Sequence, residues 1–204
     1  MTVSDAQLRQ NPRPWMTDGS IDFIEANLRT TDEVIEYGGG WSSLWWAKRA
    51  AFTLTVEADY KWASQLLNEV AAHPELMTRW ALRFVPSDWN PDATRPKQYW
   101  TANAAHLTPA AAELMTNRYL WIDFEPDVFV IDGSIRPKNI EIVDEYLKSH
   151  HRPRMIVVDN METLSKFTVG RFDGFRQFDF PEFDIEKIPK HQNGKWMTSV
   201  WIQM

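Results

Sequence analysis

Acidic residues and a glycine cluster follow the first apolar runs of the sequence. Glu36 lies inside the run VIEY, and Glu57 ends the run FTLTVE. Three consecutive glycines come between them, directly after VIEY: Gly38, Gly39 and Gly40. A glycine turn after a buried strand lets the backbone approach a ligand closely, and an acid at the end of the next strand can accept both ribose hydroxyls. The pattern therefore predicts a nucleoside-binding site.

Further polar residues follow two later apolar runs. Asp132 follows VFVI, and the pair Asp159 and Asn160 follows MIVV. If these runs are neighbouring parallel strands, their ends bring two carboxylates and an amide together, which are oxygen ligands suited to Mg²⁺ or Ca²⁺. The same residue types also cap the helices that follow strands, so both interpretations stay open. Arg136, in DGSIRP, could hold an anionic substrate or pair with a neighbouring acid.

Strands and helices that alternate along the chain would position these side chains. Apolar runs predict strands at 33–37, 52–57, 79–86, 127–132 and 154–159, and helical spacing predicts helices at 42–50, 60–73, 109–119 and 137–150. This alternation is typical of parallel βαβ units. Two final strands, 174–180 and 196–204, have no helical pattern between them. An antiparallel last strand fits that ending better.

Four segments of the chain resemble successive motifs of one enzyme family, the class I S-adenosylmethionine (SAM)-dependent methyltransferases. They are PRPWMTDGSIDFIEANL, VIEYGGGWSSLWWAKRAAFTLTVEAD, DVFVIDGSIR and MIVVDN. The resemblance implies an α/β, Rossmann-like fold. Its sheet has seven strands, is mostly parallel and has an antiparallel last strand, with helices on both faces. We expect residues 1–18 to form an N-terminal arm and residues 19–204 a single methyltransferase-like domain.

The resemblance also assigns residues to the cofactor SAM. Glu36 would orient the glycine turn and face the methionine amino group, and Glu57 would bind the ribose. Gly38 and Gly40, with Gly39 between them, would make room for the methionine and ribose of SAM. Ser42 would cap the next helix near the methionine carboxylate. Asp88 would contact adenine, and Asp132 would lie beside the transferred methyl group.

The pattern of Asp132 followed by Asp159 and Asn160 resembles the catechol-type, metal-dependent O-methyltransferases. The resemblance implies catalytic roles for the two aspartates and a divalent ion held by all three side chains. The catalytic lysine of that type would fall near Ile135, whereas the chain has Lys138. We therefore expect O-methyl transfer to a small-molecule or sugar-like acceptor, with Mg²⁺ or Ca²⁺ as an open question.

Two other functions stay open. One is a SAM- or nucleoside-binding module without transfer activity, acting as a regulatory or scaffold subunit. The other is a dinucleotide-dependent oxidoreductase, which Ser43 disfavours because a G-x-G-x-x-G turn would have glycine there.

Composition excludes some chemistry and suggests the surroundings. The chain has no Cys, which excludes disulfides, a cysteine nucleophile and cysteine-ligated iron–sulfur clusters. Its net charge of −6 makes nucleic acid an improbable partner, since a nucleic-acid footprint needs a basic face. No apolar run is long enough to cross a membrane, so we expect a cytoplasmic protein. The oligomeric state is open.

Overall fold

The computed structural model describes residues 12–86, 106–111, 125–188 and 194–204. These residues form a seven-stranded sheet in the order β3-β2-β1-β4-β5-β7-β6. The strands are β1 (Glu33–Tyr37), β2 (Phe52–Glu57), β3 (Trp80–Phe84), β4 (Val128–Ile131), β5 (Met155–Asp159), β6 (Phe175–Glu182) and β7 (Trp196–Gln203). The pairs from β3 to β5 are parallel, and β7 is antiparallel to both of its neighbours.

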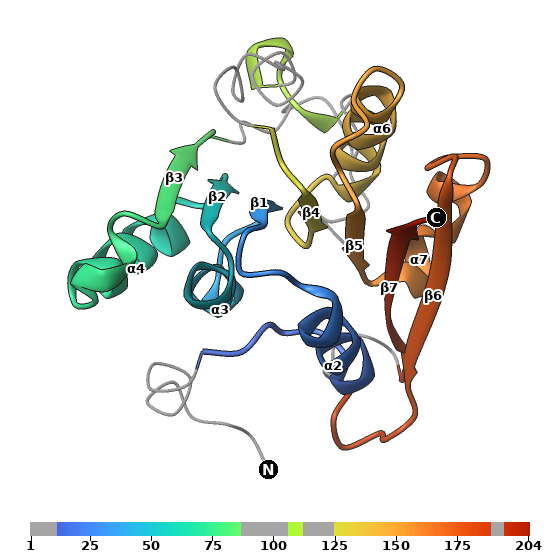
Figure 1. Ribbon diagram of the computed structural model, residues 1–204, viewed down its shortest axis with the longest axis horizontal. Coiled ribbons are helices and arrows are strands. Elements are labelled where there is room, and N and C mark those ends of the chain that lie inside the picture. The colour runs from blue at the N-terminus through green and yellow to red at the C-terminus, as the bar shows by residue number, and fades with distance from the viewer. Residues whose placement is uncertain (1–11, 87–105, 112–124, 189–193) are drawn as a thin grey trace.

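Helices cover both faces of this sheet. They are α2 (Asp18–Asn27), α3 (Trp41–Arg49), α4 (Tyr60–Ala71), α6 (Arg136–Leu147) and α7 (Met161–Thr168), with a 3₁₀ turn η1 (Pro74–Leu76). In Figure 1, α2, α3 and α4 lie on one side of the strands and α6 on the other. The result is a three-layer α/β arrangement, as the sequence predicts.

Each face of the central strands has its own hydrophobic core. Ile35 and Phe129 pack in the cluster that contains the buried residues of α6, and Val34 and Val130 pack with Trp46 of α3. All four strand residues are fully buried, which explains why these strands read as continuous apolar runs.

The chain changes direction across the sheet between β1 and β4. The sequence moves from β1 outward through β2 to β3, and then returns to β4 on the other side of β1. In open α/β sheets, ligands bind in the crevice at the carboxyl ends of the strands where the order reverses. The glycine turn after β1 and the turn after β4 both lie there.

The predicted strands agree with the observed ones apart from small differences at their ends. The antiparallel last strand is confirmed, and it lies inside the sheet, between β5 and β6. Helix α7 was not predicted from the sequence; it spans only 8 residues and buries Met161 and Leu164. The predicted helix at 109–119 falls mostly outside the described residues.

Only the last part of the predicted N-terminal arm is described. Met16 packs in the same cluster as α2 and α3, and the backbone N–H of Thr17 donates to Thr198 Oγ1 of β7 at 3.2 Å. The boundary between residues 18 and 19 stays a prediction. None of the helices in the described part of the chain is long and apolar enough to span a membrane.

Candidate functional site

The glycine turn packs directly against the turn after β4. Gly38 has φ +96°, and its N–H donates to the carbonyl oxygen of Val56 at 2.9 Å. On the other side, the N–H of Asp132 donates to the carbonyl oxygen of Tyr37 at 2.9 Å. A Cβ atom on Gly38 would lie 2.2 Å from Cα of Gly133. Both the left-handed φ and this close approach of two backbones require glycine at 38.

Glu36 is completely buried beneath the glycine turn. Its Oε2 accepts hydrogen bonds from Ser43 Oγ and from Thr55 Oγ1, the latter at 3.1 Å. Its Oε1 is buried and has no hydrogen-bond partner among the described residues. Burial raises the pKa of the Glu36 carboxyl from 4.5 to about 7, although the hydroxyl contacts oppose that rise. A cationic ligand group at this turn would supply the missing partner.

Ser43 joins the turn to Glu36, and the hydroxyl of Ser42 is also close enough to lower the pKa of that carboxyl. Ser43 Oγ also accepts a hydrogen bond from the N–H of Gly40 at 3.2 Å, so it fixes both the acid and the glycine turn. The N-cap of α3 is Gly40, and Ser42 lies buried in the first turn of the helix. The predicted N-cap role of Ser42 is therefore wrong. In the sequence, Ser43 served only as evidence against a dinucleotide-binding motif, and its contact with Glu36 was not predicted.

Glu57 stabilises the other side of the turn. Its Oε2 accepts from the N–H of Gly39 at 2.5 Å, and its Oε1 accepts from the N–H groups of Ala58 and Asp59, each at 2.6 Å. Burial raises the pKa of the carboxyl despite these three bonds. Because an ionised carboxylate offers about four acceptor positions, about one stays available for a hydroxyl.

A hollow of about 240 Å³, open to solvent, lies beside these groups. It is lined by Tyr37, Gly38, Val56, Glu57, Ala58, Ser134 and Asn139. Asn139 is 1% exposed, and its Oδ1 has no hydrogen-bond partner among the described residues. Only about 10 Å³ of this hollow is enclosed, far below the ~300–1,000 Å³ of most ligand pockets, so a nucleoside would need more room than these residues leave.

Arg136, the first residue of α6, lies buried between the turns after β4 and β5. Its Nε donates to the carbonyl oxygen of Gly133 at 2.9 Å. Nη2 donates to Asp132 twice, to the carbonyl oxygen at 2.6 Å and to Oδ1 at 2.8 Å. Nη1 donates to the carbonyl oxygen of Asp159 at 2.7 Å and to Oδ1 of Asn160. All five N–H groups of the guanidinium are thereby used.

The predicted metal ligands therefore do not form an open metal site. The guanidinium of Arg136 already supplies a positive charge to Asp132, Asp159 and Asn160. In the described ranges of the chain, no group of three or more His, Cys, Asp or Glu side chains could hold a metal ion. Lys138, which the sequence suggested as a displaced catalytic lysine, pairs with Glu141 at 3.0 Å.

The two aspartates differ in their access to a ligand. Asp159 accepts hydrogen bonds from Thr198 Oγ1 at 2.6 Å and from Trp196 Nε1 at 3.1 Å, and its side chain is 4% exposed. The side chain of Asp132 is 17% exposed. Burial raises the pKa of both carboxyls, and Arg136 opposes that rise. Asp132 is the one that a substrate could reach.

The structure thus brings Glu36, Glu57 and Asp132 to one edge of the sheet. The Asp132 carboxyl is close enough to the other two for their charges to raise its pKa. Asp159 and Asn160 lie one strand further along the sheet, behind Arg136. Asp88 lies outside the described residues.

Comparison with known proteins finds similarity in structure only. No protein-family model matches the sequence, and no curated protein matches it. A protein of Streptococcus pneumoniae assigned as a tRNA (m1A22) methyltransferase aligns with TM-score 0.53 and 10% identity, over 92% of this chain and 71% of that one. Its complex with SAM also matches, with TM-score 0.52 and 12% identity over 92% and 73% of the two chains.

Two further solved structures are similar to the same degree. A dimethyladenosine transferase of Plasmodium falciparum gives TM-score 0.52 at 10% identity, over 93% of this chain and 62% of that one. A methyltransferase-like protein of Silicibacter pomeroyi gives TM-score 0.52 at 17% identity, over 94% of this chain and 89% of that one.

These neighbours overturn the predicted partners, a small-molecule acceptor with nucleic acid improbable. The small-molecule acceptor was expected from the O-methyltransferase-like pattern of Asp132, Asp159 and Asn160. The expectation against nucleic acid came from a net charge of −6, but a charge summed over a whole chain does not show where the charges lie. The strand order, the antiparallel β7 and the structural neighbours together show that the chain has the Rossmann-like fold of the class I SAM-dependent methyltransferases.

Proposed function

We propose that this protein is a SAM-dependent methyltransferase. The observation that carries the proposal is the buried carboxylate of Glu36, whose Oε1 lacks a partner directly beneath the glycine turn. The turn lies where the strand order reverses in a sheet of the methyltransferase type. A buried carboxylate needs a charged or hydrogen-bonded partner, and the amino group of SAM would supply one.

The charge of the site supports the same cofactor. The charges of Asp159, Glu36 and Glu57 all raise the pKa of Asp132, and the guanidinium of Arg136 opposes them. An acidic site attracts a cationic ligand, and SAM carries a sulfonium and an ammonium. When bound, SAM would supply the methyl group, Glu57 would accept a ribose hydroxyl, and Asp132 would orient the acceptor by hydrogen bonding.

We further propose RNA as the acceptor, because structural neighbours with a TM-score above 0.5 include a protein assigned as a tRNA methyltransferase.

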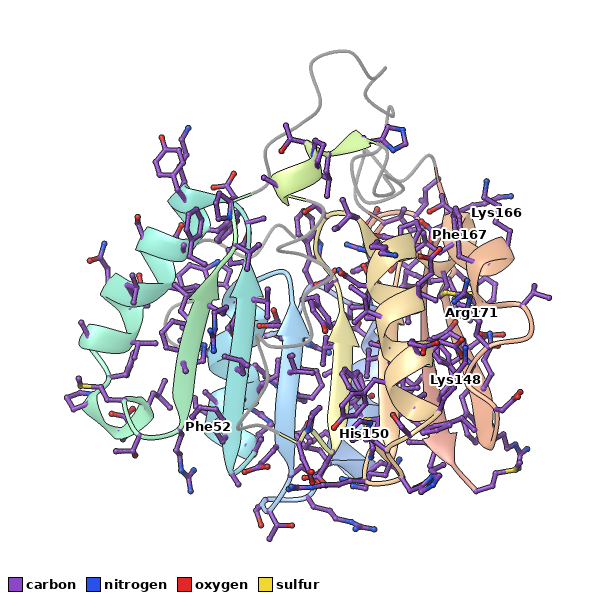
Figure 2. All side chains as sticks on the ribbon, turned by 90° about the horizontal axis from the view of Figure 1, so that it is seen from above. Phe52, Lys148, His150, Lys166, Phe167 and Arg171 are labelled. Carbon is purple, nitrogen blue, oxygen red and sulfur yellow. The ribbon has the colours of Figure 1, made fainter. Side chains whose placement is uncertain are left out.

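The metal-assisted O-methyl route loses its support, since Arg136 holds the ligands on which it depends. On the face formed by α6 and α7, two basic side chains share one acidic partner. Lys148 and Arg171, labelled in Figure 2, both pair with Asp144.

Incubating the protein with SAM that carries a labelled methyl group tests this function. We expect SAM to bind in calorimetry and the label to enter tRNA in a panel that also contains small hydroxylated and amine acceptors. SAM binding without labelled product in any acceptor would favour the binding module without transfer activity. Absence of SAM binding would contradict the proposal.

Replacing Glu57 by alanine should weaken SAM binding by about 1.5–3 kcal/mol, the range for hydrogen bonds to a charged group. The matched control is Asp59→Ala in the same turn. Asp59 caps α4 through the N–H groups of Lys61 and Trp62, so its loss should lower stability by about 1 kcal/mol without changing SAM affinity. Calorimetric titration of both variants measures the difference. Equal affinities for Glu57→Ala and the native chain would exclude Glu57 from the ribose site.

A further inference from the structure

Arg136 connects two turns that come from different strands. Three of its bonds go to carbonyl oxygens, those of Asp132, Gly133 and Asp159, so the guanidinium holds the backbone of both turns. Its charge also faces the side-chain oxygens of Asp132 and Asp159, at 2.8 and 3.6 Å. The side chain of Arg136 is only 5% exposed. A buried guanidinium with complete hydrogen bonding is a fixed part of the site rather than a surface charge.

The residues that precede α6 and α7 both have left-handed backbone conformations. Ile135, the residue before Arg136, has φ +53° and ψ +34°, a left-handed conformation that β-branched residues rarely adopt. Asn160, the residue before α7, has φ +59° and ψ +37°. For a β-branched residue such as Ile135 this conformation costs of order 1–3 kcal/mol and persists where the surrounding structure imposes it, whereas asparagine adopts it readily. At Ile135 the strained turn directs the next side chain inward, between Asp132 and Asp159.

We propose that Arg136 is a built-in cation that takes the place of a divalent ion at the ends of β4 and β5. In this role it is a positioning residue, because it acts on the reaction through Asp132. The three oxygens around its guanidinium, Asp132 Oδ1, Asp159 Oδ2 and Asn160 Oδ1, are of the types that Mg²⁺ and Mn²⁺ bind. The intact protein therefore needs no divalent ion there, and removal of the guanidinium exposes a divalent-cation site.

The proposal concerns the same crevice as the proposed function, and only its catalytic consequence rests on that function. Cation binding is measured without SAM or an acceptor. A failure of methyl transfer therefore leaves the cation test intact, and a failure of the cation test leaves methyl transfer intact.

Mn²⁺ titration followed by electron paramagnetic resonance tests the inference. We expect Arg136→Ala to bind one Mn²⁺ at least about tenfold more tightly than the native chain, equivalent to about 1.4 kcal/mol. Arg136→Ala should also melt at a lower temperature than the native protein, and saturating Mn²⁺ should recover part of that loss. The matched control is Lys138→Ala, which removes a cation from the same helix and should bind no more Mn²⁺ than the native chain.

Two further variants keep the test decisive. Adding Asp159→Asn to Arg136→Ala should abolish the gained binding, because the cation loses one of its two carboxylates. If Arg136→Ala does not fold, Arg136→Lys takes its place: a lysine ammonium cannot reach both turns, so millimolar guanidinium ion should raise its melting temperature and leave that of the native chain unchanged. Tight Mn²⁺ binding by the native chain would overturn the inference. Failure of Arg136→Ala to gain Mn²⁺, or of Arg136→Lys to respond to guanidinium, would do the same.

Discussion

Alanine at position 38 should leave little folded protein, with a loss of more than about 4 kcal/mol of unfolding free energy. The new Cβ would lie 2.2 Å from Cα and 2.3 Å from N of Gly133, and 2.8 Å from the carbonyl carbon of Asp132. These are backbone atoms of the β4 turn, so no side chain can rotate away to make room. The φ of +96° adds to the cost for any residue with a Cβ. Urea unfolding followed by circular dichroism measures the loss.

Gly174→Ala is the matched control for that experiment. Gly174 has φ +84°, and a Cβ there would meet no atom within 4 Å. It therefore isolates the conformational cost of a positive φ, about 1–2 kcal/mol. The difference between the two variants is the cost of the contact between the β1 and β4 turns. If Gly38→Ala lost no more stability than Gly174→Ala, the close approach of the two turns would be wrong.

Glu36→Gln should have opposite effects on stability and on cofactor binding. The native carboxyl has a pKa of about 7 when folded and 4.5 as its unperturbed value, because burial disfavours its charge. Above pH 7 the folded protein therefore carries a buried charge that costs up to about 3 kcal/mol, which glutamine removes. At pH 8 the variant should unfold at a higher urea concentration. SAM should bind about 1.5–3 kcal/mol more weakly, because the neutral amide of glutamine cannot form an ion pair with the amino group of SAM.

The pH dependence of the native protein has a definite sign. Between pH 4.5 and 7 an unfolded chain has lost the Glu36 proton while the folded chain still holds it. This carboxyl therefore lowers the free energy of unfolding as pH rises through that window, and its effect is constant above it. Glu36→Gln should flatten that part of the stability curve. A variant curve parallel to the native one from pH 5 to 8 would contradict the assigned pKa.

Glu162→Gln is the control that separates stability from binding. Burial also raises the pKa of Glu162 to about 7, and its Oε1 is buried without a partner among the described residues. Glu162 lies on α7, where its Oε2 accepts from the N–H of Met197 at 3.0 Å, away from the glycine turn. We expect a smaller gain in stability, because this side chain is partly exposed, and unchanged SAM affinity. A similar loss of SAM affinity in both variants would remove Glu36 from the cofactor site.

The sequence predicted the strands well because each central strand is buried on both faces. Short apolar runs rich in β-branched and aromatic residues, such as VFVI, favour buried strands, and their alternation with helical segments indicates a parallel topology. Helix α7 was missed because its 8 residues carry only two buried positions, Met161 and Leu164. Its start is also hidden, since Asn160 begins the helix from a left-handed conformation without a side-chain cap.

The candidate site was predicted less completely than the fold. Position along the strands placed Glu36, Glu57 and Asp132 at one edge, because parallel strands end together. The sequence could not show which charge lies between Asp132 and Asp159. Arg136 reaches them from the first turn of α6, through a backbone conformation that no pattern indicates for isoleucine. A pair of acids can therefore indicate a metal site in the sequence when an arginine lies between them in the structure.

The position of β7 has a consequence for how the protein folds. Among the described strands, β6 pairs with β7 alone, and β7 comes later in the chain. During refolding, β6 can therefore join the sheet only together with β7 or after it, although Phe178 and Phe180 of β6 also pack on Phe23 of α2. The pairing of β7 along β5 is a long-range event. Long-range pairing of this kind slows folding, because the entropy of closing the intervening chain is lost before the contacts form. Until that event, the apolar edge of β5 is exposed to intermolecular strand pairing.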